Sequence, residues 1–184
     1  MSSVNAPFGL RAAYHPSGTI RTEAGTVASA YSSDIYRDQP VKIYTDGTIV
    51  AAAATDAIVG AFAGVEWDGS DGRHRVSNFW PANTVGSNIV AYFTQDPLII
   101  YEIQADGSIA QNQTGEESNF SNVATSNGLG QSTATISASS SASVAGVLRI
   151  TGLTPGPFNA WGDSYTVVRV MISKHQFMAS SSPF

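Results

Sequence analysis

Three histidines are the first residues to consider for chemistry, because imidazole is both a common metal ligand and a general base. His15 lies near the N-terminus, His74 lies between two arginines, and His175 follows a strongly apolar segment. None has a second histidine or a carboxylate at a metal-ligand spacing such as His-x-x-x-His, and the chain has no cysteine. We therefore expect no metal site.

Paired carboxylates are the second kind of candidate, because two of them flanking a glycosidic bond can hydrolyse it. The candidates are Glu66, Asp68, Asp96 and Glu102. Turn formation explains two of these residues, since Asp68 precedes a glycine and Asp96 precedes a proline. No serine lies in a Gly-x-Ser-x-Gly motif, and no helix is expected after Gly128-Leu129-Gly130 to complete a dinucleotide site. We expect no catalytic or cofactor-binding residue, no cofactor and no enzymatic activity.

Aromatic side chains leave two alternatives, a sugar-binding face or an ordinary core. The residues concerned are Trp67, Trp80, Tyr92, Tyr101 and Trp161. Core filling is favoured for the two tyrosines. Trp161 differs, because it lies between Asn159 and Asp163 just after a Pro-Gly-Pro turn. It either anchors this turn onto its own domain or inserts into a pocket of a neighbouring subunit.

Short strands must position these residues, because turn signals recur along the chain and no helical period is present. Residues 41–44 and 48–50 flank Asp46-Gly47, which predicts a hairpin with positive φ at both turn positions. Residues 58–67 form a strand with small side chains on both faces. That pattern predicts close crossing by another backbone.

Later strands are expected at residues 74–80, 88–94 and 98–103, the last two paired through a turn at Gln95-Asp96-Pro97. The segment 150–177 begins as a strand and ends in the most apolar strand of the C-terminal half. Together these patterns predict an all-β fold, either an antiparallel β-barrel or a jelly-roll-like sandwich, with an extended N-terminal arm.

The chain divides into three parts by composition. Residues 1–30 carry spaced prolines, glycines and single apolar residues, which fits either an extended arm that reaches a partner or a lead-in packed on its own domain. Residues 31–177 form a single β domain, in which the Ser-, Asn- and Thr-rich stretch 111–143 is expected to be a loop or insertion. Residues 178–184 form a small polar tail.

Charge is scarce in this sequence. Only 12 % of the 184 residues are charged, the net charge is −5, and the nine basic residues are scattered. Such a surface suits a subunit of a larger assembly and argues against nucleic-acid binding by a basic patch. No signal peptide and no membrane-spanning segment is expected, so we expect no membrane partner.

Several segments resemble one protein family. They are Asn5-Ala6-Pro7-Phe8-Gly9-Leu10-Arg11, Asp46-Gly47-Thr48-Ile49-Val50, Ile58-Val59-Gly60-Ala61-Phe62 and Asn159-Ala160-Trp161-Gly162-Asp163, followed by Tyr165-Thr166 and His175-Gln176. These motifs are similar to those of the head decoration, or cement, proteins of tailed bacteriophages. The stretch 111–143 does not share this likeness.

The resemblance implies a β-rich virion protein, assembled in the host cytoplasm, that binds the outer surface of the phage head. There it would bridge subunits of the major capsid protein, as a homodimer or homotrimer on a symmetry axis. The expected capsid contacts are Asn5, Pro7, Phe8, Leu10, Arg11 and Tyr14, and the expected oligomer or core anchors are Trp161, Asn159 and Asp163. We also expect residues 1–14 to be removable without unfolding the β domain. The alternative is a carbohydrate- or receptor-binding β module of a tail fibre or spike.

Overall fold

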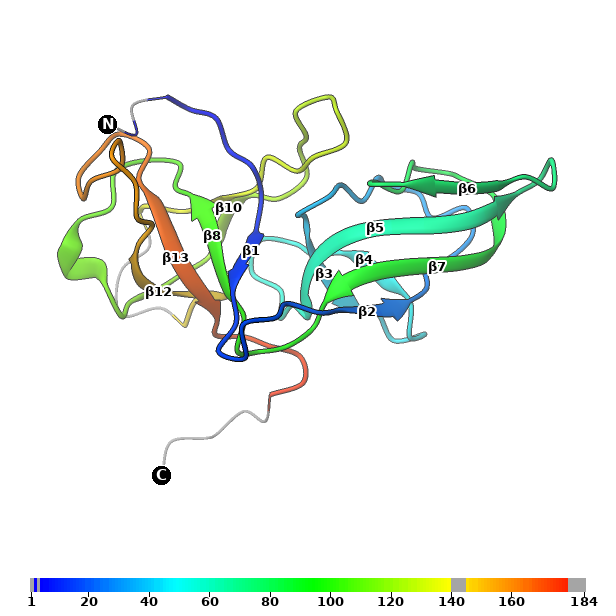
Figure 1. Cartoon of the computed structure of the whole chain (residues 1–184), viewed down its shortest axis with the longest axis horizontal. Coiled ribbons are helices and arrows are strands. Elements are labelled where there is room, and N and C mark those ends of the chain that lie inside the picture. The colour runs from blue at the N-terminus through cyan, green and yellow to red at the C-terminus, as the bar shows by residue number, and fades with distance from the viewer. Residues whose placement is uncertain (1, 3, 140–144, 179–184) are drawn as a thin grey trace.

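The computed structural model describes residues 2, 4–139 and 145–178, in which nearly all regular structure is β-strand (Figure 1). A five-stranded sheet has the order β1 (Arg11–Tyr14), β8 (Ile100–Gln104), β13 (Val167–Ile172), β12 (Leu148–Leu153) and β9 (Glu117–Ser118). A six-stranded sheet has the order β2 (Thr22–Gly25), β7 (Gly86–Thr94), β5 (Gly60–Gly69), β3 (Pro40–Ile43) and β4 (Ile49–Ala51), with β6 (His74–Ser77) also paired to β5. A small pair, β10 (Phe120–Asn122) and β11 (Thr135–Ile136), and the 3₁₀ helix η1 (Gln111–Gln113) complete the fold.

The two large sheets lie side by side as two lobes, each with its own hydrophobic core. Alternate residues of β13 point inward, so that Val168, Val170 and Ile172 are buried in the first core, under the five-stranded sheet. The second core is built around Phe62 and Trp80. The all-β antiparallel prediction is confirmed in its sandwich form rather than as a barrel, because neither sheet closes on itself.

The predicted pairing of residues 88–94 with 98–103 is wrong. Strand β7 belongs to the six-stranded sheet and β8 to the five-stranded sheet, so Gln95-Asp96-Pro97 carries the chain from one lobe to the other. The linker between β1 and β2 crosses between the same sheets, because β1 pairs with β8 and β2 pairs with β7. We call this crossing, formed by residues 15–21 and 95–99, the seam.

The hairpin predicted at Asp46-Gly47 is confirmed as the antiparallel pair β3–β4. Its turn differs from the prediction, since Gly47 has a φ of +83° and Asp46 does not have a positive φ. The Gly47 N–H donates to the Tyr44 carbonyl over 2.9 Å, and the Tyr44 N–H donates to the Thr48 carbonyl over 2.8 Å. This is a longer hairpin loop, in which only the glycine must adopt the left-handed conformation.

The N-terminal segment has extended backbone, but it lies on its own chain. Leu10 is fully buried in the first core and its N–H donates to the Asp38 carbonyl over 2.7 Å. Strands β1 and β2 extend the edges of the two large sheets. The lead-in alternative therefore describes this segment, and Leu10 is a core residue rather than an exposed capsid contact.

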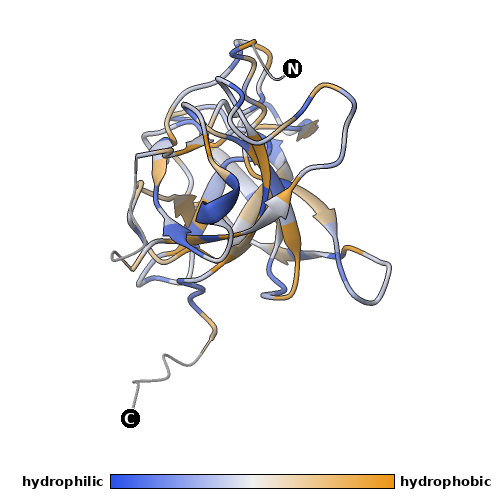
Figure 2. Cartoon of the chain, turned by 90° about the vertical axis from the view of Figure 1, so that its left-hand side faces the viewer, coloured by the Kyte–Doolittle hydropathy of each residue, from blue (hydrophilic) through white to orange (hydrophobic). Residues whose placement is uncertain are grey.

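The polar stretch 111–143 contributes side chains to the first core. Phe120 and Ile136 are buried in the first core. Two polar residues of the stretch, Ser132 and Thr135, are also buried, and Thr135 lies in β11. The 3₁₀ helix η1, which Figure 2 shows on the outside of this lobe, has no buried residue, and neither do residues 121–129. The end of the stretch and most of the predicted tail lie outside the described residues.

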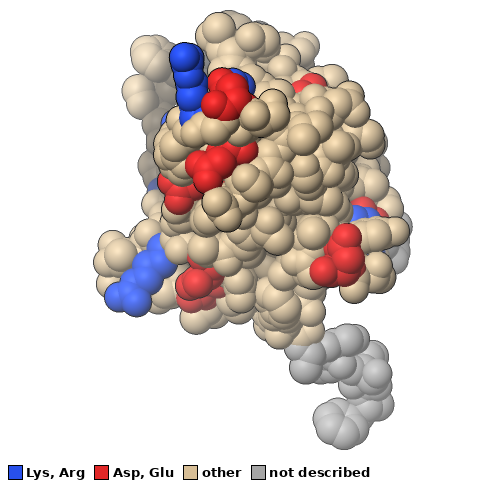
Figure 3. Space-filling model, turned by 90° about the vertical axis from the view of Figure 1, so that its right-hand side faces the viewer, with Lys and Arg blue, Asp and Glu red and all other residues tan. Residues whose placement is uncertain are grey.

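The surface agrees with the low charge of the sequence. Figure 3 shows acidic and basic side chains scattered over one end of the molecule, with most of the area belonging to other residue types. In the described part of the chain, no helix is long and apolar enough to cross a membrane.

Candidate interaction surface

The expected capsid-contact residues lie on one stretch of backbone, and most of them are accessible. Asn5 and Tyr14 are exposed, whereas Pro7 and Phe8 are half-buried. The Arg11 guanidinium stacks over the Phe8 ring, with 4.5 Å between its central carbon and the ring centroid. This cation–π contact holds two of the expected contact residues in one arrangement at the surface.

A buried carboxylate fixes that arrangement from below. Glu102 of β8 is 8 % exposed, and its Oε2 lies 2.6 Å from Arg11 Nη2. The Nε of Arg169 on β13 lies 3.5 Å from the other oxygen, Oε1. Arg11 is still half-exposed, so part of its guanidinium can meet a partner.

Beside this segment stands the loop 126–131, which carries a prominent apolar side chain. Leu129 is 80 % exposed at its tip. The Asn127 side-chain oxygen accepts the backbone N–H of Leu129 over 2.9 Å, and the Gln131 amide donates to the Phe8 carbonyl over 3.2 Å. The Gln131 end of the loop is therefore tied to the N-terminal segment, and Figure 1 shows the rest of the loop projecting to the right of that segment. We call Asn5, Phe8, Arg11 and Leu129 together the N-terminal face.

Sequence reasoning missed Leu129. It is the single large apolar residue in the run Ser126-Asn127-Gly128-Leu129-Gly130, and such an isolated residue in a polar turn is a detectable signal. The loop also meets Asp38, whose Oδ2 lies 3.4 Å from the Gln131 amide nitrogen. Burial raises the pKa of Asp38, which the nearby Arg37 guanidinium partly opposes.

The C-terminal anchor residues make contacts within the chain. The Asn159 amide donates to the carbonyls of Thr154 and Val167 over 2.8 and 2.7 Å, and its oxygen accepts the Val167 N–H over 3.0 Å. Asp163 accepts the backbone N–H groups of Ser2 and Ala160, and the bond from Ser2 lowers its pKa most. Both residues therefore hold their own loop in place.

Trp161 packs against the first core and is partly buried, so the inward alternative describes it. The Gly162 N–H beside it donates to the Ile109 carbonyl over 2.9 Å, which ties the loop to the same lobe. The outward-facing ring of this loop belongs instead to Phe158, which is 73 % exposed.

The other aromatic candidates do not form a sugar-binding face. Trp67 and Trp80 are buried and meet edge to face, with ring centroids 5.5 Å apart. Tyr101 is fully buried with its hydroxyl 2.9 Å from Thr94 Oγ1, and burial raises its pKa. The Tyr92 hydroxyl donates to Glu66 over 2.7 Å. The core interpretation is correct for both tryptophans and for Tyr101.

Glu66 and Asp68 do come together, around His74 on the exposed side of the second lobe. His74 Nδ1 lies 2.8 Å from Asp68 Oδ1, and Nε2 lies 3.5 Å from Glu66 Oε2. The hydrogen bond to Asp68 raises the pKa of His74 most strongly. Asp68 also accepts from the Asn88 amide, so both carboxylates already have partners. Among the described residues, no group of three or more His, Asp or Glu is arranged to hold a metal ion.

A serine, a histidine and an aspartate converge at the seam, which the sequence spacing did not indicate. Ser17 Oγ lies 2.7 Å from His15 Nδ1, and His15 Nε2 lies 3.1 Å from Asp96 Oδ2, outside hydrogen-bond geometry. The two N–H groups after this serine could have formed an oxyanion hole, but they serve the turn. Gly18 N–H donates to the His15 carbonyl, and Thr19 N–H donates to Ser17 Oγ. A turn explains this arrangement without nucleophilic chemistry.

His175 is the one histidine that the fold buries. From its burial we predict that the stability of the protein depends on pH. Its ring is 5 % exposed, Nδ1 accepts the Phe177 N–H, and Nε2 has no hydrogen-bond partner among the described residues. Burial lowers the pKa of His175, and the backbone of Gln95 and Val59 opposes this only in part. The unfolded chain therefore takes up a proton near pH 6.5 that the folded chain does not, so stability falls as the pH drops below that value.

Replacing His175 with glutamine should flatten this acid-side loss, measured by denaturant unfolding between about pH 5 and pH 7.5. His74→Gln is the control with the opposite sign. Its folded pKa is raised, so His74 stabilises the fold at low pH and its removal should make the acid-side loss steeper. Equal slopes for the native protein and His175→Gln would contradict this interpretation.

Comparison with protein families, characterised proteins and solved structures found no match to this chain. The functional argument therefore rests on the residues, their geometry and the resemblance of the sequence motifs.

Proposed function

We propose that the protein is a structural subunit of a tailed-bacteriophage virion that decorates the outer surface of the head. Its partners are the major capsid protein and further copies of itself, as a homodimer or homotrimer. The observation that carries this proposal is the N-terminal face, where Arg11 stacks on Phe8 and a hydrogen bond from Gln131 to the Phe8 carbonyl links that segment to the loop that exposes Leu129. Arginine and aromatic side chains are enriched at protein interfaces, and Leu129 adds an exposed apolar side chain on the linked loop.

The rest of the surface supports an assembled rather than a freely diffusing protein. Ten of the described large apolar side chains are at least half exposed, including Val4, Val76, Val85 and Phe158. Only 12 % of the sequence is charged, so little repulsion would keep copies apart. The resemblance of the N-terminal and C-terminal motifs to head decoration proteins points to the same class.

Decoration would work by multivalent binding. Each N-terminal face would make one modest contact, and the lattice of a head would present many such contacts at fixed spacing. Because the N-terminal segment is already ordered on its own chain, binding would not lose further conformational entropy by ordering it. Bridging of neighbouring capsid subunits would then stiffen the shell.

Replacing Leu129 with aspartate should weaken retention on phage heads about tenfold, because it places a charge where an apolar anchor should be buried. The measurement is co-sedimentation of purified protein with heads that lack it, over a range of protein concentrations. Val76→Asp is the matched control, since Val76 is 74 % exposed on β6 in the other lobe. Equal retention of both variants would reject the N-terminal face, and a native protein that never sediments with heads would reject the function.

A further inference from the structure

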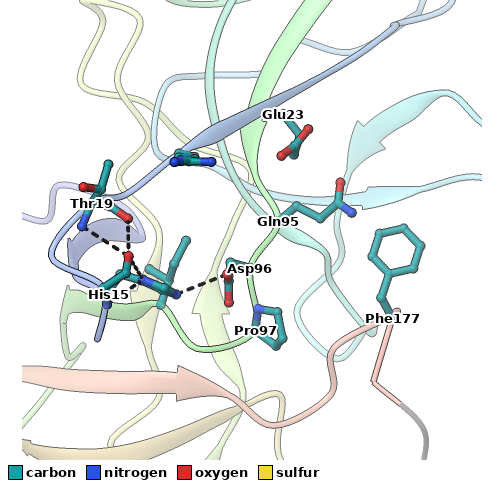
Figure 4. A pocket seen from close by; sticks show the side chains of 10 residues that line it. His15, Thr19, Glu23, Gln95, Asp96, Pro97 and Phe177 are labelled. Carbon is teal, nitrogen blue, oxygen red and sulfur yellow. Dashed lines mark hydrogen bonds and ion pairs between the residues drawn. The ribbon is translucent and has the colours of Figure 1, made fainter.

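A cavity of about 720 Å³ opens at the seam between the two lobes (Figure 4). Its walls come from both linkers that cross the seam and from the C-terminal segment. They include His15, Arg21, Glu23, Gln95, Asp96 and Phe177. The volume lies within the range of about 300–1,000 Å³ that is usual for small-molecule sites.

The strand register explains why the cavity exists. Tyr14 pairs with Ile100 and Thr22 pairs with Thr94, so seven residues, 15–21, lie opposite only five, 95–99. The longer linker must arch away from the shorter one, and the sheets on either side hold both ends of each linker. The cavity is therefore fixed by the fold rather than by the chance placement of a loop.

In one part of the wall, several polar groups already have partners. Asp96 accepts the Leu98 N–H with Oδ1 over 2.8 Å and holds His15 beside Oδ2. His15 in turn accepts the Ser17 backbone N–H over 3.1 Å. These contacts hold this edge of the cavity in place and leave His15 Nε2 without a hydrogen bond.

The other part of the wall has polar groups without partners. Within the described chain, the side chains of Arg21, Glu23 and Gln95 make no hydrogen bond and no ion pair. In Figure 4, Glu23 and Gln95 extend toward the same open space, and Phe177 stands across from them. The Phe177 ring is half-exposed and lies 6.1 Å from the His175 ring. A donor, an acceptor, an amide and an aromatic ring thus surround one space.

The charges of the wall limit what could bind there. Arg21 and Glu23 carry opposite signs, and Asp96 adds a further negative charge, so a phosphate or another polyanion would gain little. A wholly apolar ligand would leave the free polar groups desolvated and unpaired, which is costly. A neutral molecule with many hydroxyl groups satisfies these groups, and one face of its ring can lie on an aromatic side chain.

We propose that the seam cavity binds a neutral saccharide of one or two rings. Glu23 accepts hydrogen bonds from sugar hydroxyls, Arg21 donates to them, and the Gln95 amide does both. Phe177 covers the apolar face of the ring. This binding goes beyond head decoration, because it adds a weak affinity for a glycan.

The test is ligand-observed saturation-transfer NMR on the full chain with methyl glycosides of glucose, galactose, rhamnose and N-acetylglucosamine, and with maltose and lactose. At least one probe should receive saturation, with a dissociation constant of millimolar order because the site is open. Phe177→Ala and Glu23→Gln should each abolish the transfer, whereas Phe158→Ala, which removes an exposed ring elsewhere, should leave it unchanged. Thermal unfolding of each variant shows that the fold is intact, and Glu23→Gln serves alone if Phe177→Ala is destabilised.

Silence of every probe with the native protein would overturn the proposal, and so would transfer that survives both cavity variants. The outcome is independent of the proposed function, because Glu23 lies outside the N-terminal face. A Glu23→Gln protein that still sediments with heads but no longer receives saturation separates the two activities. Loss of head retention by Leu129→Asp with normal saccharide binding separates them in the other direction.

Discussion

Replacing Leu10 with alanine is expected to lower the free energy of unfolding by about 2–5 kcal/mol, the usual cost of truncating a fully buried leucine. Leu10 is 0 % exposed in the first core, and its N–H donates to the carbonyl of Asp38, which lies just before β3. The cavity left by the mutation would therefore lie where the N-terminal segment, the first core and the start of β3 meet. Chemical denaturation at neutral pH measures the change.

Tyr14→Ala is the matched control, because Tyr14 lies in the same segment but is half-exposed on the edge strand β1. Its cost should stay within about 1 kcal/mol. If both variants are equally stable, the segment does not pack as described. Deletion of residues 1–14 would remove Leu10 and β1 together, so it is expected to destabilise the fold and cannot serve as a clean test of capsid binding.

Local signals in the sequence identified much of the fold. Asp46-Gly47 between two apolar runs specified the β3–β4 hairpin, because a short antiparallel connection depends mainly on its own residues. The small residues of β5 indicated a close crossing, and Gly60 does face the backbone of Thr94. Alternation in the last strand marked β13, whose inward residues fill the first core.

The pairing of β7 and β8 shows where such signals end. Two strands joined by a short turn containing Asp96 and Pro97 look like a hairpin, yet β8 pairs with β1 and β13 instead. Those partners lie at opposite ends of the chain, and local pattern does not encode which distant strand offers the matching edge. The same limit hid the seam cavity, since Arg21 and Gln95 come together only through that crossing.

The candidate site was predicted only in part for a related reason. Asn159 and Asp163 stood out by composition and resemblance, but their hydrogen bonds hold their own loop and, through Asp163, the backbone of Ser2. Leu10 is buried whereas Asn5 and Arg11 in the same segment are exposed, and the spacing of residues in the sequence does not reveal this difference. Leu129 became a candidate only through the hydrogen bond between Gln131 and Phe8, which joins its loop to a segment that is distant in the sequence.

Replacing Gly60 with alanine is expected to cost about 3 kcal/mol or more, at the upper end of what overpacking does. A Cβ on Gly60 would lie 1.9 Å from the Thr94 carbonyl oxygen and 2.8 Å from the Thr94 carbonyl carbon. Thr94 has no room to retreat, because its Oγ1 accepts the Ala61 N–H over 2.9 Å and lies 2.9 Å from the hydroxyl of the buried Tyr101. Relief of the clash would have to part β5 from the end of β7.

Gly152→Ala separates this steric effect from the general consequence of replacing glycine in a strand. Gly152 lies in β12, and a Cβ there would meet nothing within 4 Å. That variant should be neutral or more stable by up to about 1 kcal/mol, because alanine narrows the unfolded ensemble. Because Thr94 immediately precedes the seam, Gly60→Ala should also weaken saccharide binding at the cavity while Gly152→Ala leaves it intact. A Gly60→Ala protein as stable as Gly152→Ala would mean that β5 and the end of β7 do not approach as closely as this contact indicates.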